Sequence, residues 1–296
     1  MPEDLKYTEI TIRTHLDAVE GLSDLLMSLG AKGIAEERHP FDIRLTAYLI
    51  VDDNTPDPAE AIRTRLKALE KEGLRIGHGT IGLRTVASTA WSEAWKDQFS
   101  SQQIAPGLVI APSWEERKPL PGECVVVLDP GAAFGTGGHA TTRLCLRALI
   151  EVMRPGDRVA DIGTGSGILA IAAALLGAHE VVAADNDASA LPVARRNAER
   201  NKVAGQIKII EADLLPADEG PFDVILCNIV AEEIVRLSEH LFPLLSWGGR
   251  FIGSGYIAAA VPMVEDALAR AHLQLLDTRS EEGWAASIAI KPARTA

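Results

Sequence analysis

The spacing of apolar residues predicts that the chain begins with a small α+β domain. Residues 7–14 alternate as a half-buried strand does, and leucines recur at helical spacing from Leu16 to Leu29, with Gly30 as the expected end. Two strands follow at 33–38 and 41–51, joined by a turn at His39-Pro40, and then a helix at 61–71 and a strand at 74–86. The order β-α-β-β-α-β predicts a ferredoxin-like fold for residues 1–86. Such a sheet often presents a surface to a partner, and a purely structural extension is the alternative.

A second, longer domain is predicted after a connecting segment. Residues 87–103 are expected to form a linker helix, because Trp91, Trp95 and Phe99 stand at i, i+4 and i+8 on one stripe. From residue 104 to 296, short apolar runs alternate with helical patterns, which is typical of a doubly wound, mostly parallel sheet. The expected strands are 104–112, 124–128, 159–162, 180–185, 207–212, 222–228, 250–254, 273–277 and 285–290. The expected helices are 143–150, 168–176, one that is capped by Asp187 or Ser189 and runs to Asn201, 231–245 and 261–271. Thr141 or Thr142 is the expected N-cap of the first of these helices.

The turn after residues 159–162 carries the strongest chemical signal. Asp161 is followed by Gly163, Gly165 and Gly167 and then by a long apolar helix. Glycines at a strand-to-helix turn let backbone N–H groups approach a ligand closely. About twenty residues later, Asp185 ends the next strand, where a ribose diol sits in a doubly wound sheet. The pattern predicts an adenosine-binding crevice.

S-adenosylmethionine and NAD both contain adenosine, and the spacing favours the first, with a glycine turn that binds no ligand as the third alternative. The third glycine of a dinucleotide fingerprint falls one place later than Gly167, where this chain has Ile168. Asp161 would repel a diphosphate but attract a sulfonium or ammonium cation.

Two further polar residues end strands at the expected ligand edge. Asn228 ends the strand at 222–228 and offers both a donor and an acceptor. Asp213 follows the strand at 207–212, either to approach the adenine amine or as a turn residue. His139 has no second histidine or cysteine at ligand spacing, so no metal is expected.

Composition limits the possible partners. The formal net charge of −12 argues against direct binding to nucleic acid and suits a basic protein partner, although acidity also serves solubility alone. The cysteines Cys124, Cys145 and Cys227 are far apart and form no disulfide pattern. No apolar run approaches about 18 residues and the first residues do not read as a signal peptide, so we expect a cytoplasmic protein without a membrane span.

A glycine-rich run before the first predicted helix of the second domain carries a family resemblance. The run Asp129-Pro-Gly-x-x-Phe-Gly-Thr-Gly-x-His-x-Thr-Thr142, followed by Asp161-x-Gly-x-Gly-x-Gly-Ile-Leu-Ala, resembles the PrmA family, the methyltransferases of ribosomal large-subunit protein L11. The similarity covers nearly the whole chain. It implies a class I methyltransferase with a Rossmann-like sheet, preceded by a substrate-recognition domain. It also implies that Thr142, Gly163, Asp185 and Asn228 bind S-adenosylmethionine.

The expected function is therefore methyl transfer from S-adenosylmethionine to lysine ε-amines, and to the N-terminal α-amine, of ribosomal protein L11 by a monomeric enzyme. No catalytic residue is assigned, and Asn228 is the candidate for orienting the amine. The sequel Ile229-Val230-Ala231-Glu232 departs from the two prolines and an aromatic of many amino-methyltransferases, which argues against a DNA-base or glutamine substrate. The alternatives are another protein substrate such as an electron-transfer flavoprotein subunit, an NAD-dependent oxidoreductase, and a non-catalytic binding protein.

Overall fold

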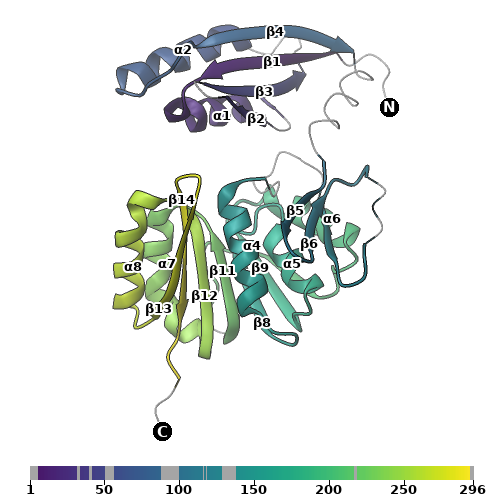
Figure 1. Ribbon diagram of the computed structural model, residues 1–296, viewed down its shortest axis with the longest axis vertical. Helices are drawn as coiled ribbons and strands as arrows, with labels where there is room; N and C mark the ends of the chain where they lie inside the picture. Colours follow the sequence, from purple (N-terminus) through teal and green to yellow (C-terminus); the bar gives the residue numbers. More distant parts are fainter. Residues whose placement is uncertain are drawn as a thin grey trace. The chain divides into compact units, whose positions relative to one another are not determined.

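The computed structural model describes residues 6–31, 34–39, 42–50, 57–87, 100–115, 117, 119–128, 138–216 and 219–293. The chain divides into two compact units, with the boundary between Ser100 and Ser101 (Figure 1). The middle of the predicted linker helix, residues 88–99 with Trp91, Trp95 and Phe99, lies outside the described residues, as does the run from Asp129 to Gly137. The predicted ends of this helix at 87 and 103 are wrong, because Ala87 ends strand β4 (Thr80–Ala87) and Gln102 begins strand β5 (Gln102–Ala105).

The first unit has the predicted ferredoxin-like arrangement. Its elements are β1 (Lys6–Thr14), η1 (Leu16–Ala18), α1 (Val19–Ser28), β2 (Ile34–Arg38), β3 (Ile43–Ile50), α2 (Pro58–Lys71) and β4 (Thr80–Ala87). The described strands form an antiparallel sheet in the order β2-β3-β1-β4. Ile10, Ile12 and Leu45 of one sheet face pack with Leu22 of α1 and Ile62 of α2 in a separate core.

Three boundaries in this unit differ from the predicted ones. Leu16 lies in a 3-10 turn and is 54% exposed, so the helical stripe begins later than expected. Helix α2 begins at Pro58, because Asp57 accepts a hydrogen bond from the N–H of Ala59 (2.9 Å) and proline suits the first turn. The last strand begins only at Thr80, because Gly77 and Gly79 adopt positive φ angles.

The second unit contains the predicted doubly wound sheet. Its order is β10-β9-β8-β11-β12-β14-β13, parallel from β10 to β12 and antiparallel at β14 and β13. The strands are β8 (Arg158–Ile162), β9 (Glu180–Asp185), β10 (Ile207–Glu211), β11 (Phe222–Asn228), β12 (Leu245–Ile257), β13 (Gln274–Glu281) and β14 (Trp284–Ile290). The strand order reverses between β8 and β11, and ligands of open α/β sheets bind at such a point, outside the carboxyl ends of the strands.

Helices cover both faces of this sheet (Figure 1). Helices α4 (Ala140–Val152) and α5 (Ile168–Leu175) pack on the face that carries Val159 and Val224, together with residues of α6 (Ala190–Arg200). Helices α7 (Ala231–Leu244) and α8 (Val261–Arg270) pack on the face that carries Ala160 and Ile225. The α/β fold class is confirmed.

Two predicted strands of this unit differ from the observed ones in number or length. The single strand at 104–112 is a hairpin of β5 (Gln102–Ala105) and β6 (Leu108–Ala111), because Gly107 turns the chain at φ +81°. It continues into β7 (Cys124–Val127) as a small sheet. The strand at 250–254 is part of the much longer β12, which begins directly after Pro243 and Leu244 end α7.

Within the described ranges, none of the helices is long and apolar enough to span a membrane. The same part of the chain holds no cluster of three or more His, Cys, Asp or Glu side chains that could bind a metal ion. Cys124, Cys145 and Cys227 are unpaired thiols.

Candidate functional site

Strand register brings three of the predicted site residues into one row. Ile162 of β8 pairs with Ala184 of β9 and with Cys227 of β11, so the next residues of these strands lie side by side. The row at the carboxyl edge therefore reads Asp185, Gly163 and Asn228. The structure brings these residues together at the point where the strand order reverses.

The glycine turn that follows β8 is tightly packed. Gly163 has φ +73°, and a Cβ built on it would lie 2.4 Å from Cγ2 of Ile229. The N–H groups of Gly163 and Thr164 donate to the carbonyl of Ala184 (2.9 and 3.0 Å), which fixes the turn on β9. Glycine is required here by the approach of Ile229 as well as by the backbone angle.

Asp185 holds the turn from the neighbouring strand. Its Oδ2 accepts from the N–H of Gly165 (2.8 Å) and its Oδ1 from the N–H of Asp187 (2.9 Å). Each carboxylate oxygen has a second lone pair, so the oriented side chain can still accept from a diol.

Asn228 has a buried acceptor that is not used. Its Nδ2 donates to Oγ1 of Thr142 across 3.4 Å, a long hydrogen bond that joins β11 to α4. Its Oδ1 is buried and has no hydrogen-bond partner among the described residues. An orphaned buried acceptor costs about 1–3 kcal/mol and is an expected feature of a site whose ligand supplies the donor.

The N-cap of α4 is His139, and the prediction of Thr141 or Thr142 was wrong. Nδ1 of His139 accepts from the N–H of Thr141 (3.4 Å) and lies 2.7 Å from Oγ1 of the same residue. Capping by His139 leaves the Thr142 hydroxyl inside the first turn of the helix, where it meets Asn228.

Asp161 lies beneath the glycine turn and is fully buried. Its Oδ2 accepts from Oγ1 of Thr164 (2.7 Å) and from the N–H of Ala170 (3.1 Å), near the start of α5. The N-cap residue of α5 is Gly167, which has no side chain to bind that N–H, so Asp161 supplies the missing acceptor. Burial raises the pKa of the Asp161 carboxyl to about 6.

Asp213 is held in an ion pair. Nη1 and Nη2 of Arg236 on α7 each lie 2.7 Å from its carboxylate oxygens, and Nδ2 of Asn186 lies 3.3 Å away. Arg236 holds the pKa of the Asp213 carboxyl below its usual range. The proposed contact with the adenine amine stays a prediction.

Sequence reasoning missed the residues that support α4 from the end of the chain. Arg143, Arg147 and His139 contact Glu281, Glu282 and Trp284, more than 130 positions later. No local pattern marks such a pairing. The available signal was the turn sequence Glu281-Glu282-Gly283-Trp284 between two predicted strands.

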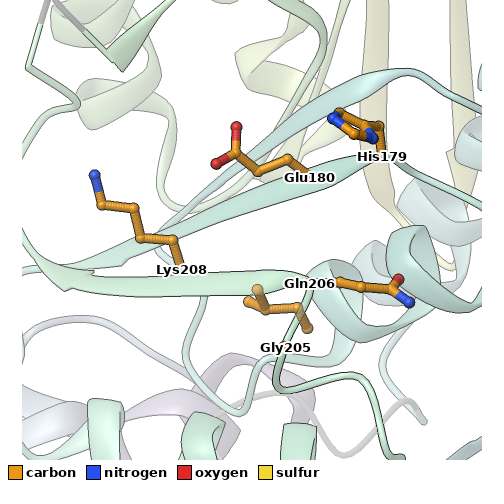
Figure 2. A pocket seen from close by; sticks show the side chains of 6 residues that line it. His179, Glu180, Gly205, Gln206 and Lys208 are labelled. Carbon is orange, nitrogen blue, oxygen red and sulfur yellow. The ribbon is translucent and has the colours of Figure 1, made fainter.

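A surface hollow of about 370 Å³ lies elsewhere on this unit and does not belong to the row of site residues. It is lined by His179, Glu180, Gly205, Gln206, Ile207 and Lys208, at the amino ends of β9 and β10 (Figure 2). Lys208 pairs with Glu219 (2.6 Å) and Glu180 with Arg158 (2.6 Å), so its charged groups already have partners. Ligands of such sheets bind at the opposite edge.

The residues at the carboxyl edge fit S-adenosylmethionine. Asp185 offers oriented acceptors for a ribose diol, the glycine turn allows close backbone approach, and Asn228 offers a buried acceptor. All three features are suited to a ligand with hydroxyl and amino donors. The assignment of Thr142, Gly163, Asp185 and Asn228 as its binding residues stays a prediction.

Comparisons with known proteins lead to the same class of enzyme. A model of the family described as "Ribosomal protein L11 methyltransferase (PrmA)" matches residues 6–292. Proteins named ribosomal protein L11 methyltransferase from Exiguobacterium sibiricum and Geobacillus kaustophilus are 36% and 37% identical, covering 98% and 97% of this chain and all of theirs. A crystal structure of ribosomal protein L11 methylase from Lactobacillus delbrueckii subsp. bulgaricus matches with a TM-score of 0.62 at 34% identity, over 66% of this chain and all of that one. The chain therefore belongs to the ribosomal protein L11 methyltransferase (PrmA) family, and its cofactor is S-adenosylmethionine.

Proposed function

We propose that this enzyme methylates ribosomal protein L11 on lysine ε-amines and on the N-terminal α-amine, acting as a monomer in the cytoplasm. The family and the names of its relatives support the substrate. The net charge of −12 supports a basic protein partner and disfavours direct contact with RNA.

The observation that carries the proposal is the buried, unpartnered Oδ1 of Asn228 beside Thr142 and the glycine turn. When bound, S-adenosylmethionine supplies an electrophilic methyl group. A carbonyl oxygen fixed at this edge can accept a hydrogen bond from an incoming amine and so orient the nitrogen lone pair. Asn228 is therefore proposed to position the substrate amine that receives the methyl group, and also to bind the cofactor.

The substrate amine must lose a proton before it can act as a nucleophile. For a lysine with a pKa of about 10.4, deprotonation at pH 7 costs about 4.6 kcal/mol. A site that removes water lowers that cost, because desolvation disfavours the charged ammonium. We assign no general base, and the proton can leave through water.

The two units are proposed to have separate tasks. Residues 1–86 would recognise the substrate, residues 87–103 would connect, and residues 104–296 would bind the cofactor and carry out the reaction. The first unit has its own core of Ile10, Leu22 and Ile62, independent of the sheet that carries the site. Separate cores allow separate functions on one chain.

The direct test is transfer of labelled methyl groups from S-adenosylmethionine to purified L11, with the modified amines located by mass spectrometry. An electron-transfer flavoprotein subunit serves as the competing substrate. We expect methyl groups on lysines and the α-amine of L11 only. Methylation of the flavoprotein subunit without L11 would refute the substrate assignment.

The division of tasks is tested by deleting residues 1–86. The shortened chain should bind S-adenosylmethionine with nearly unchanged affinity, which also shows that it is folded, and should not methylate intact L11. Full-rate methylation of L11 by the shortened chain would show that the first unit does not recognise the substrate.

A further inference from the structure

The tip of the β13–β14 hairpin contacts the first turns of helix α4. Nε of Arg143 donates to Oε1 of Glu281 (2.8 Å), and Nη2 donates to Oε1 of Glu282 (2.9 Å). One turn later, Nη1 of Arg147 donates to Oε2 of Glu281 (2.6 Å). Glu281 thus bridges two successive turns of the helix, and Arg143 directly follows Thr142.

The same tip also reaches the residues that precede the helix. Nη1 of Arg143 donates to the carbonyl of Gly138. The ring of Trp284 meets the ring of His139, the N-cap of α4, edge to face with centroids 4.7 Å apart. The hairpin therefore fixes both the cap and the first turns of the helix.

The backbone of the tip is strained at one of the contact residues. Glu282 has φ +53° and Gly283 has φ +85°, which are the left-handed angles of a two-residue hairpin turn. Asparagine or aspartate is favoured at the first of these positions, and another residue costs about 1–2 kcal/mol. Strain at a residue that also binds Arg143 suggests that the ion pair is retained for a purpose other than turn stability.

We propose that Glu281, Glu282 and Trp284 form a clamp that positions the start of α4 and thereby sets the affinity for the cofactor. The clamp keeps the Thr142 hydroxyl within 3.4 Å of Nδ2 of Asn228. None of the three is assigned a contact with the cofactor, so they are positioning residues. The inference rests on the proposed role of Thr142 in cofactor binding.

The chain offers a matched control for this clamp. Glu151 near the end of α4 accepts from Nη1 and Nη2 of Arg279 on β13 (2.9 and 2.6 Å). This pair joins the same helix to the same hairpin, but lies about 13 Å along the helix from Thr142 at 1.5 Å per residue. Glu151 is more exposed than Glu281 (57% against 24%) and has one arginine partner instead of two, so its loss should cost less stability and should not move Thr142.

The experiment compares Glu281→Gln with Glu151→Gln in the full chain, by calorimetric titration with S-adenosylmethionine and by thermal unfolding. We expect about tenfold weaker binding for Glu281→Gln and less than a twofold change for Glu151→Gln, with the larger fall in unfolding temperature in Glu281→Gln. The KM for the cofactor should rise in Glu281→Gln while kcat stays nearly constant. Equal affinities in the two variants would refute the clamp.

Glu282→Asn gives a second, independent test. Asparagine suits the left-handed turn, so the variant should be more stable, yet it loses the ion pair to Arg143 and should bind the cofactor about threefold more weakly. Greater stability with unchanged affinity would reduce the tip to a purely structural role.

Thr142→Ala distinguishes failure of the clamp from failure of the proposed role of Thr142 in cofactor binding. If Thr142→Ala keeps full affinity, the proposed cofactor role of Thr142 is wrong. If Thr142→Ala loses affinity and Glu281→Gln does not, only the clamp is wrong.

Discussion

Replacing Gly163 by alanine adds a methyl group at a tightly packed point of the site. The residue has φ +73°, and the new Cβ would lie 2.4 Å from Cγ2 of Ile229. The left-handed angle costs about 1–2 kcal/mol for an alanine. The overlap adds about 1–3 kcal/mol, the usual cost of forcing extra volume into a packed site. We expect Gly163→Ala to lower the free energy of unfolding of the second unit by about 2–5 kcal/mol.

Two companion variants separate these contributions. Gly156 also has a positive φ (+93°), but a Cβ there meets no atom within 4 Å, so Gly156→Ala reports the backbone cost alone. Ile229→Ala removes Cγ2 and leaves only a Cβ at 3.9 Å, so in that background Gly163→Ala should cost only about 1–2 kcal/mol.

The assay is urea unfolding of the full chain, followed by a signal from the second unit, combined with calorimetric titration of S-adenosylmethionine. Gly163→Ala should also lose at least about tenfold in cofactor affinity, since the turn stands between Asp185 and Asn228, whereas Gly156→Ala should not. The reasoning fails if Gly163→Ala costs no more than Gly156→Ala and if Ile229→Ala does not relieve it. The turn could then move away from Ile229, and close packing would not explain the glycine.

Three further predictions concern the neighbouring carboxylates and Asn228. Asp185→Ala should weaken S-adenosylmethionine binding by about 2–3 kcal/mol, and unchanged affinity by calorimetry would place the ribose elsewhere. Asn228→Asp should lower kcat by about 10²-fold, because the new charge favours the unreactive ammonium form of the substrate amine, and should change cofactor affinity less. Equal losses in steady-state turnover and in cofactor binding would make Asn228 only a cofactor ligand. The pKa of Asp161 is raised from 3.8 to about 6, so the native state binds the extra proton in this interval and its stability falls as the pH rises through it. Measured by urea unfolding, the wild type should lose about 2 kcal/mol relative to Asp161→Asn between pH 4 and pH 7, and a constant difference would contradict the burial argument.

Local pattern was sufficient for the order of the elements outside residues 87–112 and for the turn that carries the site. Short-range periodicity is visible in the alternation at β1, in the leucine spacing of α1 and in the run of strands and helices after residue 104. Asp185 and Asn228 could be placed at strand ends because a strand end is also a local feature. The doubly wound fold then implied that these ends share one edge.

Where local cues compete, the predicted start of a helix was wrong. Thr141 and Thr142 are better N-caps by residue type than His139, yet His139 caps α4. The hydroxyls of the threonines are used elsewhere, by His139 and by Asn228. Capping propensity describes the average preference of a residue type, whereas tertiary contacts decide which residue caps this helix.

Only the tertiary structure decided the contacts that give the site its chemistry. The pairing of Asn228 with Thr142 joins residues 86 positions apart, and the pairing of Arg143 with Glu281 joins residues 138 positions apart. The unused acceptor of Asn228 and the buried carboxylate of Asp161 likewise depend on what the folded chain places around them. Hydrogen bonding and burial are properties of neighbours in space, and a periodic pattern along the chain specifies only which face of its own element a residue occupies.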